Sequence, residues 1–432
     1  FGASWGYQVT GFYAPTNRYG TPEEFKKLVE ACAEANIGVI LDWVPAHFPS
    51  DEFSLARFDG TALFEHEDPR QGKHAEWDTL IFNYGRSEVR SFLIGSALCW
   101  LDRFGVSGFR VDAVASMLYL DYGREDGQWI PNRHGGKENL EAIEFIRQFN
   151  QAIHEEYPGV ISIAEESTAF PQITQPPAVG GLGFDFKWNM GWMHDVLSYF
   201  QASPEHRSGV HHNLTFGATY QFSENFVQSF SHDEVVHGKG SLANKMGLVQ
   251  EEDRLANLRA LFSLQWTWPG KKTLFMGCEF GQWKEWDCDS PLDWSLLDFP
   301  LHSGLRKLVS DLNHLYLSHS SWSDVDHKGD KFQWIDCNDH DGQTISFLKF
   351  GGSVDETLLI ACNFSDHLVH RDWGCPHEGN WKVILDSDGP DYGGGGSAGG
   401  INFSSFNEGR NNQPFGLAFA VAKWSVRILS PD

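Results

Sequence analysis

The stretch GFRVDAV, residues 108–114, reads as a short buried strand that carries one basic and one acidic side chain. Because side chains alternate along a strand, Arg110 and Asp112 point to the same face. A guanidinium beside a carboxylate favours its ionised form, which would let Asp112 act as a nucleophile near neutral pH. For this stretch alone, a buried structural ion pair is an equally good interpretation.

Strands of the same kind recur along the chain, with helices between them. The expected strands cover residues 37–44, 107–114, 160–166, 184–190, 226–231 and 272–280. Helices are expected after an N-cap at Thr21, over 87–104 with Ser87 as cap and Gly105 as stop, over 138–157 and near 252–266. Strands separated by helices pair in parallel. Apolar strands with polar ends favour a (β/α)8 barrel. A doubly wound sheet would instead need a Gly-rich phosphate loop after its first strand.

The pattern changes near residue 325. Short β-rich runs, separated by Gly, Asp and Asn turns, cover residues 344–350, 358–364, 381–385 and 417–429, and the glycine tract 393–400 reads as a surface loop. This spacing is typical of an antiparallel sandwich. We therefore predict a catalytic barrel domain over 1–322 and an all-β sandwich domain over 323–432.

The composition favours a neutral ligand and a reducing compartment. The 432-residue chain has a formal charge of −25 at pH 7, so the phosphates of nucleic acid or of an anionic membrane would be repelled. Its 17 Trp, 11 Tyr and 33 Phe offer flat faces that suit sugar rings, although most will lie in the core. The seven cysteines include no C-x-x-C pair, which is typical of the cytoplasm. No apolar run of about eighteen residues predicts a membrane span.

Four predicted strands end in polar clusters. The pairs are Asp42 with His47, Arg110 with Asp112, Glu165 with Glu166, and His232 with Asp233. If the strands share one barrel, these clusters meet at one mouth, whereas a purely structural role would require several costly burials of charge. Because Glu165 and Glu166 are adjacent, only one of them can face the site, and the other is expected to pack behind it.

Two carboxylates across a pocket are what glycoside chemistry needs. One, ionised beside a guanidinium, attacks the anomeric carbon, and the other, with a raised pKa on an apolar strand, protonates the departing oxygen. A zinc site at His232–His237 is the rival interpretation. It is disfavoured because a zincin helix needs Glu directly after the first His and the second His four residues on, whereas here Asp intervenes and the spacing is five.

The motifs carry a resemblance. DWVPAH (42–47), RVDAV (110–114), AEEST (164–168) and SHDE (231–234) resemble the four signature regions of the α-amylase superfamily. Within it, the flanking segments 5–8, 113–119, 132–139, 188–195 and 233–239 resemble 1,4-α-glucan (glycogen) branching enzymes. The likeness runs through almost the whole chain, with a small departure at Val9, where relatives usually carry proline.

The resemblance implies catalytic roles for three acids. Asp112 would be the nucleophile with Arg110 as its electrostatic partner, and Glu165 would be the acid/base. Asp233 would be the third carboxylate, gripping the ring hydroxyls of the reacting glucose. An α-1,4 bond would be cleaved to give a glucosyl-enzyme, which a glucan 6-hydroxyl would attack to form an α-1,6 branch. Both steps invert, so the α configuration is retained, and the carboxyl groups of Asp112 and Glu165 should lie about 5 to 5.5 Å apart.

The resemblance also implies substrate-binding residues. His47 and His232 would hydrogen-bond the same glucose, Tyr7 would stack beneath it, and Asp42 would brace the cluster. Neither a cofactor nor a metal is implied, and the partner would be an α-glucan bound by a full-length enzyme that is a monomer.

The family carries an amino-terminal carbohydrate-binding sandwich and two barrel strands upstream of the region that this chain resembles. We therefore expect the chain to be a fragment of a longer enzyme that by itself folds poorly or is inactive, because a barrel lacking two strands has open edges. Two alternatives remain. One is an α-glucan hydrolase of the amylase or maltooligosyl trehalohydrolase type, and the other is a glucan-binding protein without catalysis.

Overall fold

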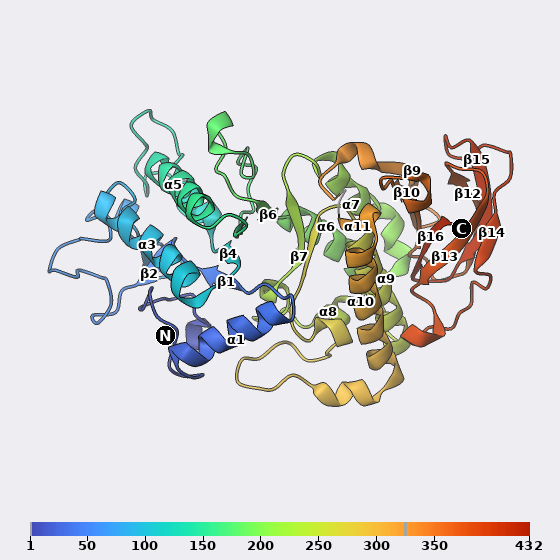
Figure 1. The fold of residues 1–432 in the computed structure, drawn as a ribbon, viewed down its shortest axis with the longest axis horizontal. Helices are drawn as coiled ribbons and strands as arrows, with labels where there is room; N and C mark the ends of the chain where they lie inside the picture. Colours follow the sequence, from blue (N-terminus) through green and yellow to red (C-terminus); the bar gives the residue numbers. More distant parts are fainter. Residues whose placement is uncertain (1, 324–325) are drawn as a thin grey trace. The chain divides into compact units, whose positions relative to one another are not determined.

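The protein is described by a computed structural model that covers residues 2–323 and 326–432. By its internal contacts the chain falls into two compact units, Phe1–Trp188 and Asn189–Asp432, and each is described by itself. Figure 1 shows the order of the helices and strands along the chain.

A parallel sheet organises the first unit. Its strands pair in the order β1 (Ile40–Trp43), β4 (Gly108–Val111), β5 (Ile161–Ala164) and β6 (Phe186–Trp188). In the register of the sheet, Asp42 lies opposite Arg110, and Val111 lies opposite Ala164. Because the strands are parallel and in step, the residues that follow them emerge at one edge, as expected for a barrel.

Helices of the first unit cover one side of this sheet (Figure 1). They are α1 (Pro22–Glu34), α3 (Ser87–Phe104) and α5 (Leu140–Glu156), with the shorter α2 (Pro69–Gly72) and α4 (Val114–Leu118) in the connections. As predicted, Thr21 caps α1 in a capping box with Glu24, and Gly105 ends α3 in the left-handed region with φ 70. The prediction of Ser87 as cap was wrong, because the helical turn already includes it. Arg86 occupies the N-cap position and makes no side-chain cap hydrogen bond.

A short hairpin lies beside the first sheet. β2 (His47–Pro49) pairs antiparallel with β3 (Thr79–Ile81), and His47 lies opposite Ile81 in the register. The apolar core of this unit is built around Trp43, whose ring stacks on Phe149 at 4.6 Å.

The second unit begins with helices and a parallel strand pair. Its helices are α6 (Met190–Gln201), α7 (His212–Thr215), α8 (Leu242–Lys245), α9 (Glu251–Thr267), α10 (Pro300–Ser318) and α11 (Ser320–Ser323). Strand β7 (Phe226–Phe230) pairs in parallel with β8 (Lys271–Leu274). The predicted strand over 272–280 is shorter than expected, because a turn and a 3-10 helix over Cys278–Phe280 follow β8.

Antiparallel strands complete the second unit, as predicted. They are β9 (Phe332–Asp339), β10 (Thr344–Lys349), β11 (Leu358–Asn363), β12 (Val369–Cys375), β13 (Asn380–Asp386), β14 (Asn402–Ser404), β15 (Phe415–Val421) and β16 (Ser425–Pro431). One sheet has the order β14-β13-β16-β11-β10-β9, and β12 pairs with β15. The run 417–429, expected as one strand, forms parts of two, because the chain turns at Trp424 with φ 44.

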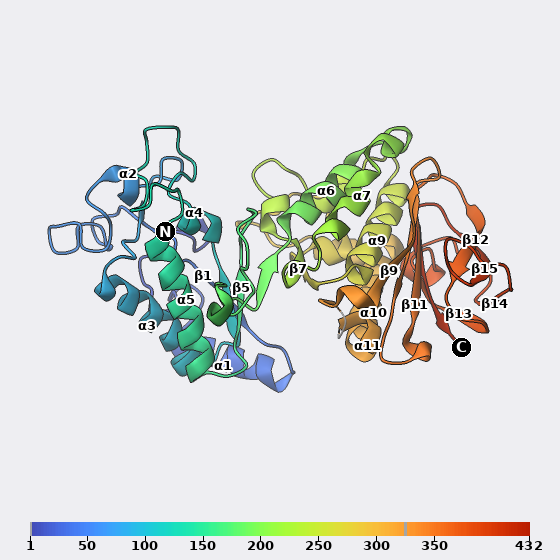
Figure 2. The same cartoon turned by 90° about the horizontal axis from the view of Figure 1, so that it is seen from above.

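One hydrophobic core runs through much of the second unit. Helix α9 is buried along its length from Leu255 to Thr267 and packs against β11 and β16 (Figure 2). Leu258 of α9 and Leu308 of α10 belong to the same core cluster as Ile360 and Ile428 of the C-terminal sheet. This core therefore includes residues on both sides of position 322, and the domain boundary expected there stays a prediction.

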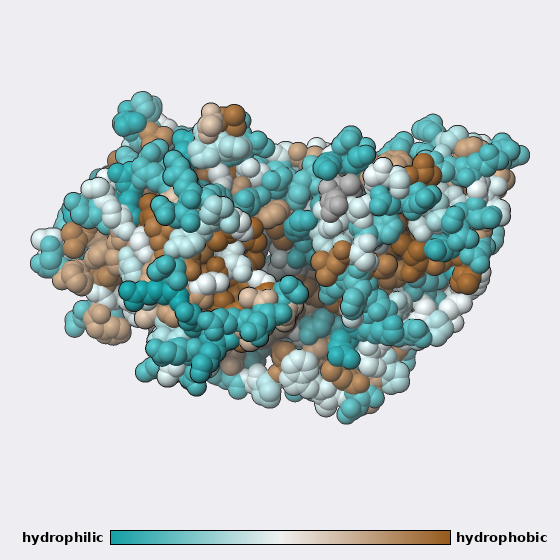
Figure 3. Space-filling view, in the orientation of Figure 1, coloured by the Kyte–Doolittle hydropathy of each residue, from teal (hydrophilic) through white to brown (hydrophobic). Residues whose placement is uncertain are grey.

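Figure 3 shows one face of the protein, on which hydrophilic residues predominate and hydrophobic ones are exposed among them. The most exposed large apolar side chains include Phe53 and Val249. Within residues 2–323 and 326–432, no helix is both long and apolar enough to cross a membrane.

Candidate active site

Arg110 gathers three carboxylates at the carboxyl edge of the first sheet. Its Nη1 lies 2.6 Å from Asp42 Oδ1 and 2.6 Å from Asp112 Oδ1, and its Nη2 lies 3.6 Å from Glu165 Oε2. The Arg110 side chain is 8% exposed and that of Asp112 is 12% exposed, so their contact is shielded from solvent, whereas the Asp42 side chain is 44% exposed. Of the predicted polar residues, Asp42, Arg110, Asp112 and Glu165 thus lie together at this edge.

Burial decides the protonation of Asp112. Loss of solvation raises the pKa of Asp112, and the charges of Glu165 and Asp42 raise it further, against the lowering effect of Arg110. We predicted that Arg110 keeps Asp112 ionised. Arg110 does lower the pKa of Asp112, but the net shift of that pKa is upward, so the prediction was wrong in its net direction. Because Asp112 and Glu165 repel each other, a proton on Glu165 favours ionised Asp112.

The two adjacent glutamates have different surroundings. Glu165 Oε2 accepts a hydrogen bond of 2.6 Å from the Ala113 N–H and lies near Arg110. Glu166 is fully buried and forms an ion pair of 2.6 Å with Lys187 Nζ, and it also accepts from the Thr168 N–H. Glu165 thus faces the Arg110 cluster, and Glu166 packs behind it.

A left-handed residue turns the chain at the end of β4. Ala113 has φ 53 and ψ 37, a conformation that costs an L residue roughly 1–2 kcal/mol. This turn aims its N–H at Glu165, while the Asp112 N–H donates to the Trp43 carbonyl at 2.9 Å. The sequence carries no signal for this turn, because alanine is not a residue that favours the left-handed region.

Aromatic rings enclose the guanidinium. The Tyr7 hydroxyl donates to Asp42 Oδ2, and the Tyr7 ring centroid lies 5.6 Å from Arg110 Cζ. The Trp188 ring centroid lies 4.5 Å from the same atom. Trp188 was not predicted as a site residue, since only the pairing of β6 with β5 brings it to this edge. Both rings favour the cation by their negative faces.

His47 lies beside this cluster on β2. It is buried, and burial lowers the pKa of His47 to about 4, although its ring donates a hydrogen bond to the Tyr7 main-chain carbonyl. The imidazole is therefore neutral at pH 7 and can donate or accept a hydrogen bond without carrying charge.

His232 and Asp233 belong to the second unit, where they directly follow β7 in the 3-10 helix η5 (His232–Glu234). Ser231 caps this turn by accepting from the Asp233 N–H at 3.2 Å, and Glu234 reaches back to the Ser231 N–H. His232 Nε2 lies 3.5 Å from Asp233 Oδ1. The S-x-x-E capping box was legible in the sequence and explains why Glu234 is buried.

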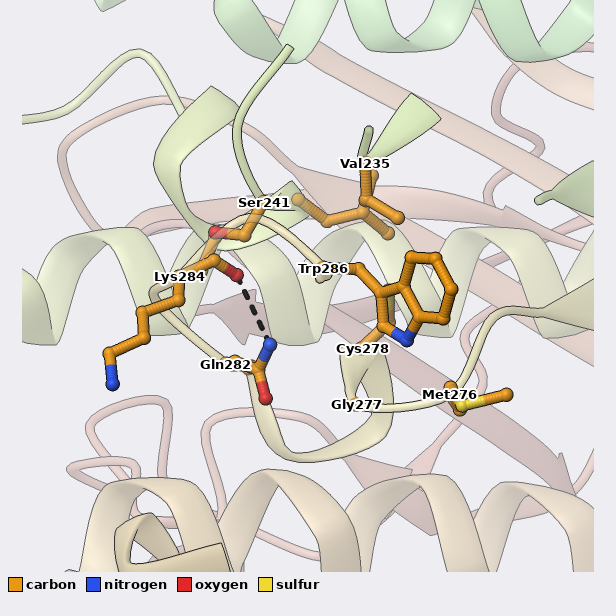
Figure 4. Close-up of a pocket in the computed structure, with 11 residues that line it drawn as sticks. Val235, Ser241, Met276, Gly277, Cys278, Gln282, Lys284 and Trp286 are labelled. Atoms are coloured by element: carbon orange, nitrogen blue, oxygen red, sulfur yellow. Dashed lines mark hydrogen bonds between the residues drawn. The ribbon is translucent and has the colours of Figure 1, made fainter. Parts of the chain in front are cut away.

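A small cavity lies beside this turn, between segments 235–243 and 276–286 (Figure 4). Its volume is only about 10 Å³, room for about one water molecule, and its lining includes the apolar side chains of Val235, Met276 and Trp286. The main-chain N–H of Trp286 donates to the main-chain carbonyl of Val235 at 3.1 Å, which links the two segments. Burial raises the pKa of the Cys278 thiol in this lining, so Cys278 is a poor nucleophile.

The possible metal ligands cluster elsewhere. Among the described residues, the one group with ligand atoms close enough for a shared ion is Asp287, Cys288 and Asp289, all exposed. Such surface groups are common without an ion.

The fold agrees with comparisons to known families. Residues 74–344 match the alpha amylase catalytic domain, and residues 334–432 match the alpha amylase C-terminal all-beta domain. The first match covers more than half of the chain, and the chain therefore belongs to the alpha-amylase family. The predicted fold class, a barrel-type parallel sheet followed by an antiparallel sandwich, is confirmed.

Curated relatives carry a more specific name. The chain is 56% identical over 393 residues to the 1,4-alpha-glucan branching enzyme GlgB of Marinobacter nauticus, covering 90% of this chain and 62% of that protein. It is 54% identical over 403 residues to the protein of the same name from Nitratidesulfovibrio vulgaris, covering 92% of this chain and 62% of the relative. The resemblance to branching enzymes is thus confirmed, and the chain spans less than two thirds of the length of these relatives.

Solved structures share the fold. An alpha-amylase from Geobacillus thermoleovorans, solved with acarbose, superposes with a TM-score of 0.65 at 15% identity, covering 98% of this chain and 84% of that one. An alpha-amylase from H. orenii gives a TM-score of 0.64 at 18% identity, covering 99% and 87%.

Proposed function

We propose that the protein containing this chain is a 1,4-α-glucan branching enzyme, which cleaves an α-1,4 bond and transfers the released segment to a 6-hydroxyl. The observation that carries the proposal is that Asp112 and Glu165 are both held by one guanidinium at one sheet edge. The names of the curated relatives support the choice of reaction within the family.

In the first step, an Asp112 carboxylate oxygen attacks the anomeric carbon and the glycosidic C–O bond breaks. Glu165 gives its proton to the departing 4-oxygen, so the leaving chain departs as an alcohol and a glucosyl ester remains on Asp112. The repulsion between the two acids supports this division, because it disfavours ionising both at once.

In the second step, Glu165 takes the proton of an incoming 6-hydroxyl as that oxygen attacks the anomeric carbon and releases Asp112. Two inversions retain the α configuration. Discrimination between water and a sugar hydroxyl at this step separates a transferase from a hydrolase.

The remaining roles are proposals that rest on the motifs. Asp233 is the third carboxylate, and His47 and His232 hydrogen-bond the reacting glucose. Tyr7 provides a ring beneath that glucose, and its hydrogen bond to Asp42 supports a bracing role for both. A cytoplasmic location is supported by the cysteines, all seven of which are free thiols.

The test uses the full-length protein and amylose. Branching should lower the iodine colour, create the NMR signal of α-1,6 linkages and release few reducing ends. Asp112→Asn and Glu165→Gln should each lower kcat by at least about 10³-fold, since each removes a group that acts in the transition state. Asp112→Glu, which keeps the charge and moves the oxygen, serves as a matched variant and should also be impaired.

Two results would overturn the proposal. Reducing ends that rise in proportion to the loss of colour would make the protein a hydrolase. Binding of amylose with no change in linkage, unaffected by Asp112→Asn, would make it a glucan-binding protein.

A further inference from the structure

In the second unit, the loop over residues 237–240 folds around a single carboxylate. Glu285 Oε1 accepts a hydrogen bond of 3.0 Å from the Gly238 N–H, and Glu285 Oε2 accepts one of 2.7 Å from the Gly240 N–H. His237, Gly238 and Gly240 have φ values of 57, 79 and 70, and this left-handed backbone turns N–H groups toward an anion. The two hydrogen bonds lower the pKa of Glu285, so its carboxylate is charged at neutral pH.

Lys239, in the middle of this loop, contacts the turn that carries Asp233. Its Nζ donates a hydrogen bond of 2.6 Å to the Asp233 main-chain carbonyl. Its own N–H donates to the Val236 carbonyl at 3.2 Å, and Lys245 Nζ donates to the Lys239 carbonyl. The loop that Glu285 closes is therefore also attached to the backbone of Asp233.

The segment that carries Glu285 is fixed on both sides of the loop. Trp286, the next residue, donates its main-chain N–H to the Val235 carbonyl at 3.1 Å, and both residues are seen in Figure 4. The Asn244 side-chain amide donates to the Trp283 carbonyl at 2.6 Å. Glu285 is thus presented by a firmly placed segment, and its carboxylate sets the path of the loop.

A similar contact closes a turn elsewhere in the second unit. Glu356 Oε2 accepts hydrogen bonds from the Gly352 N–H at 2.7 Å and from the Ser353 N–H at 3.1 Å. That turn contains none of the predicted site residues, so a carboxylate that closes a turn is by itself a structural feature. Glu285 differs because the loop that it closes also donates a hydrogen bond to Asp233.

We infer that Glu285 is a positioning residue for Asp233. By closing the loop, it keeps Lys239 on the Asp233 carbonyl and fixes the direction in which the Asp233 carboxylate points. This inference rests on the proposed function, in which Asp233 grips the reacting glucose, and adds to it a residue outside the four signature motifs. Because such contacts strengthen in the transition state, a displaced Asp233 lowers kcat more than it raises KM.

The test measures the kinetics of the full-length protein with amylose. Glu285→Ala should lower kcat by about 10- to 100-fold with KM nearly unchanged, since a displacement of about 1 Å can cost that much. Glu285→Gln keeps one oxygen that accepts a hydrogen bond and should recover part of this loss. The matched control is Glu356→Ala, which breaks the same kind of contact in another turn and should leave kcat unchanged.

A double-mutant cycle shows whether Glu285 acts through Asp233. Asp233→Asn alone should lower kcat, and adding Glu285→Ala should then cost little more, because the group that Glu285 positions is already lost. If Glu285→Ala lowers the Tm far more than the control does, Lys239→Met replaces it in the cycle, because it removes the contact to Asp233 and leaves Glu285 in place.

Two results would overturn the inference. One is a kcat for Glu285→Ala, or for its replacement Lys239→Met, that equals the kcat of the control. The other is a double variant whose loss is the product of the two single losses, which would make the two residues independent. Either result would leave branching by the unmodified protein intact, whereas failure of the proposed function would show in that protein itself.

Discussion

The buried pair of Glu166 and Lys187 holds the strand end that presents Glu165, and Lys187→Met tests its strength. Lys187 Nζ lies 2.6 Å from Glu166 Oε2, and the two side chains are 7% and 0% exposed. Methionine keeps the apolar stem and removes the charge, leaving a buried carboxylate without its cation. Breaking a buried pair in this way should lower the free energy of unfolding by about 3–5 kcal/mol.

Native-state hydrogen exchange is the assay, because it reports the opening free energy of the first unit separately from the second. In Lys187→Met the amides of β4 and β5 should exchange faster, and their opening free energy should fall by about the same 3–5 kcal/mol. Lys26→Met is the matched control: its partner Glu30 lies 3.9 Å away, both side chains are more than half exposed, and the loss should stay below about 1 kcal/mol.

A double variant separates the lost charge from lost packing. Glu166→Gln combined with Lys187→Met leaves no buried charge at this position and should recover part of the stability. The reasoning is refuted if Lys187→Met speeds hydrogen exchange no more than Lys26→Met does. It is also refuted if adding Glu166→Gln to Lys187→Met lowers the free energy of unfolding by about a further 3–5 kcal/mol, the cost of breaking a second buried pair.

Further substitutions test the strand turn, the buried acid and the second unit. Asp112→Asn should raise the free energy of unfolding by about 1 kcal/mol or more at pH 8 and by less at pH 5. The pKa of Asp112 is raised in the folded protein, so folding favours the protonated acid and the wild-type protein loses stability as the pH rises through that pKa. Equal gains at both pH values in denaturant titrations would contradict this. Ala113→Gly should raise the free energy of unfolding by about 0.5–1 kcal/mol. Glycine removes the cost of holding alanine in the left-handed region, and its greater loss of backbone entropy on folding offsets part of that gain; a lowered Tm would count against this. Asp326→Asn should destabilise the second unit by about 3–5 kcal/mol. The Lys349 side chain is 1% exposed and would lose the carboxylate that lies 3.2 Å from its Nζ. Unchanged hydrogen exchange of the β10 amides would contradict this.

The sequence was sufficient for features that depend on local pattern. Alternating side chains on the 108–114 strand put Arg110 and Asp112 on one face, and the capping box at Thr21 located the start of α1. The partition of Glu165 and Glu166 also followed from strand alternation, because adjacent residues cannot face the same side.

Features set by distant parts of the chain were not legible. Trp188 reaches Arg110 only through sheet pairing, and the net pKa direction of Asp112 depends on burial by segments remote in sequence. The left-handed Ala113 is imposed by the fold against its own preference. Glu285 closes a loop by binding the Gly238 N–H, which lies 47 positions earlier in the chain.

These long-range effects share one physical origin. Three carboxylates, Asp42, Asp112 and Glu165, contact a single buried guanidinium, so Arg110 cannot neutralise them all. Burial and the charge of Glu165 raise the pKa of Asp112, so retaining one proton between these two acids costs less than ionising both. A retaining mechanism needs that proton on Glu165 and the negative charge on Asp112, beside the cation. The burial that raises the pKa of Asp112 therefore costs stability at the acid on which the proposed mechanism needs a negative charge, and Arg110 is the group that opposes this rise.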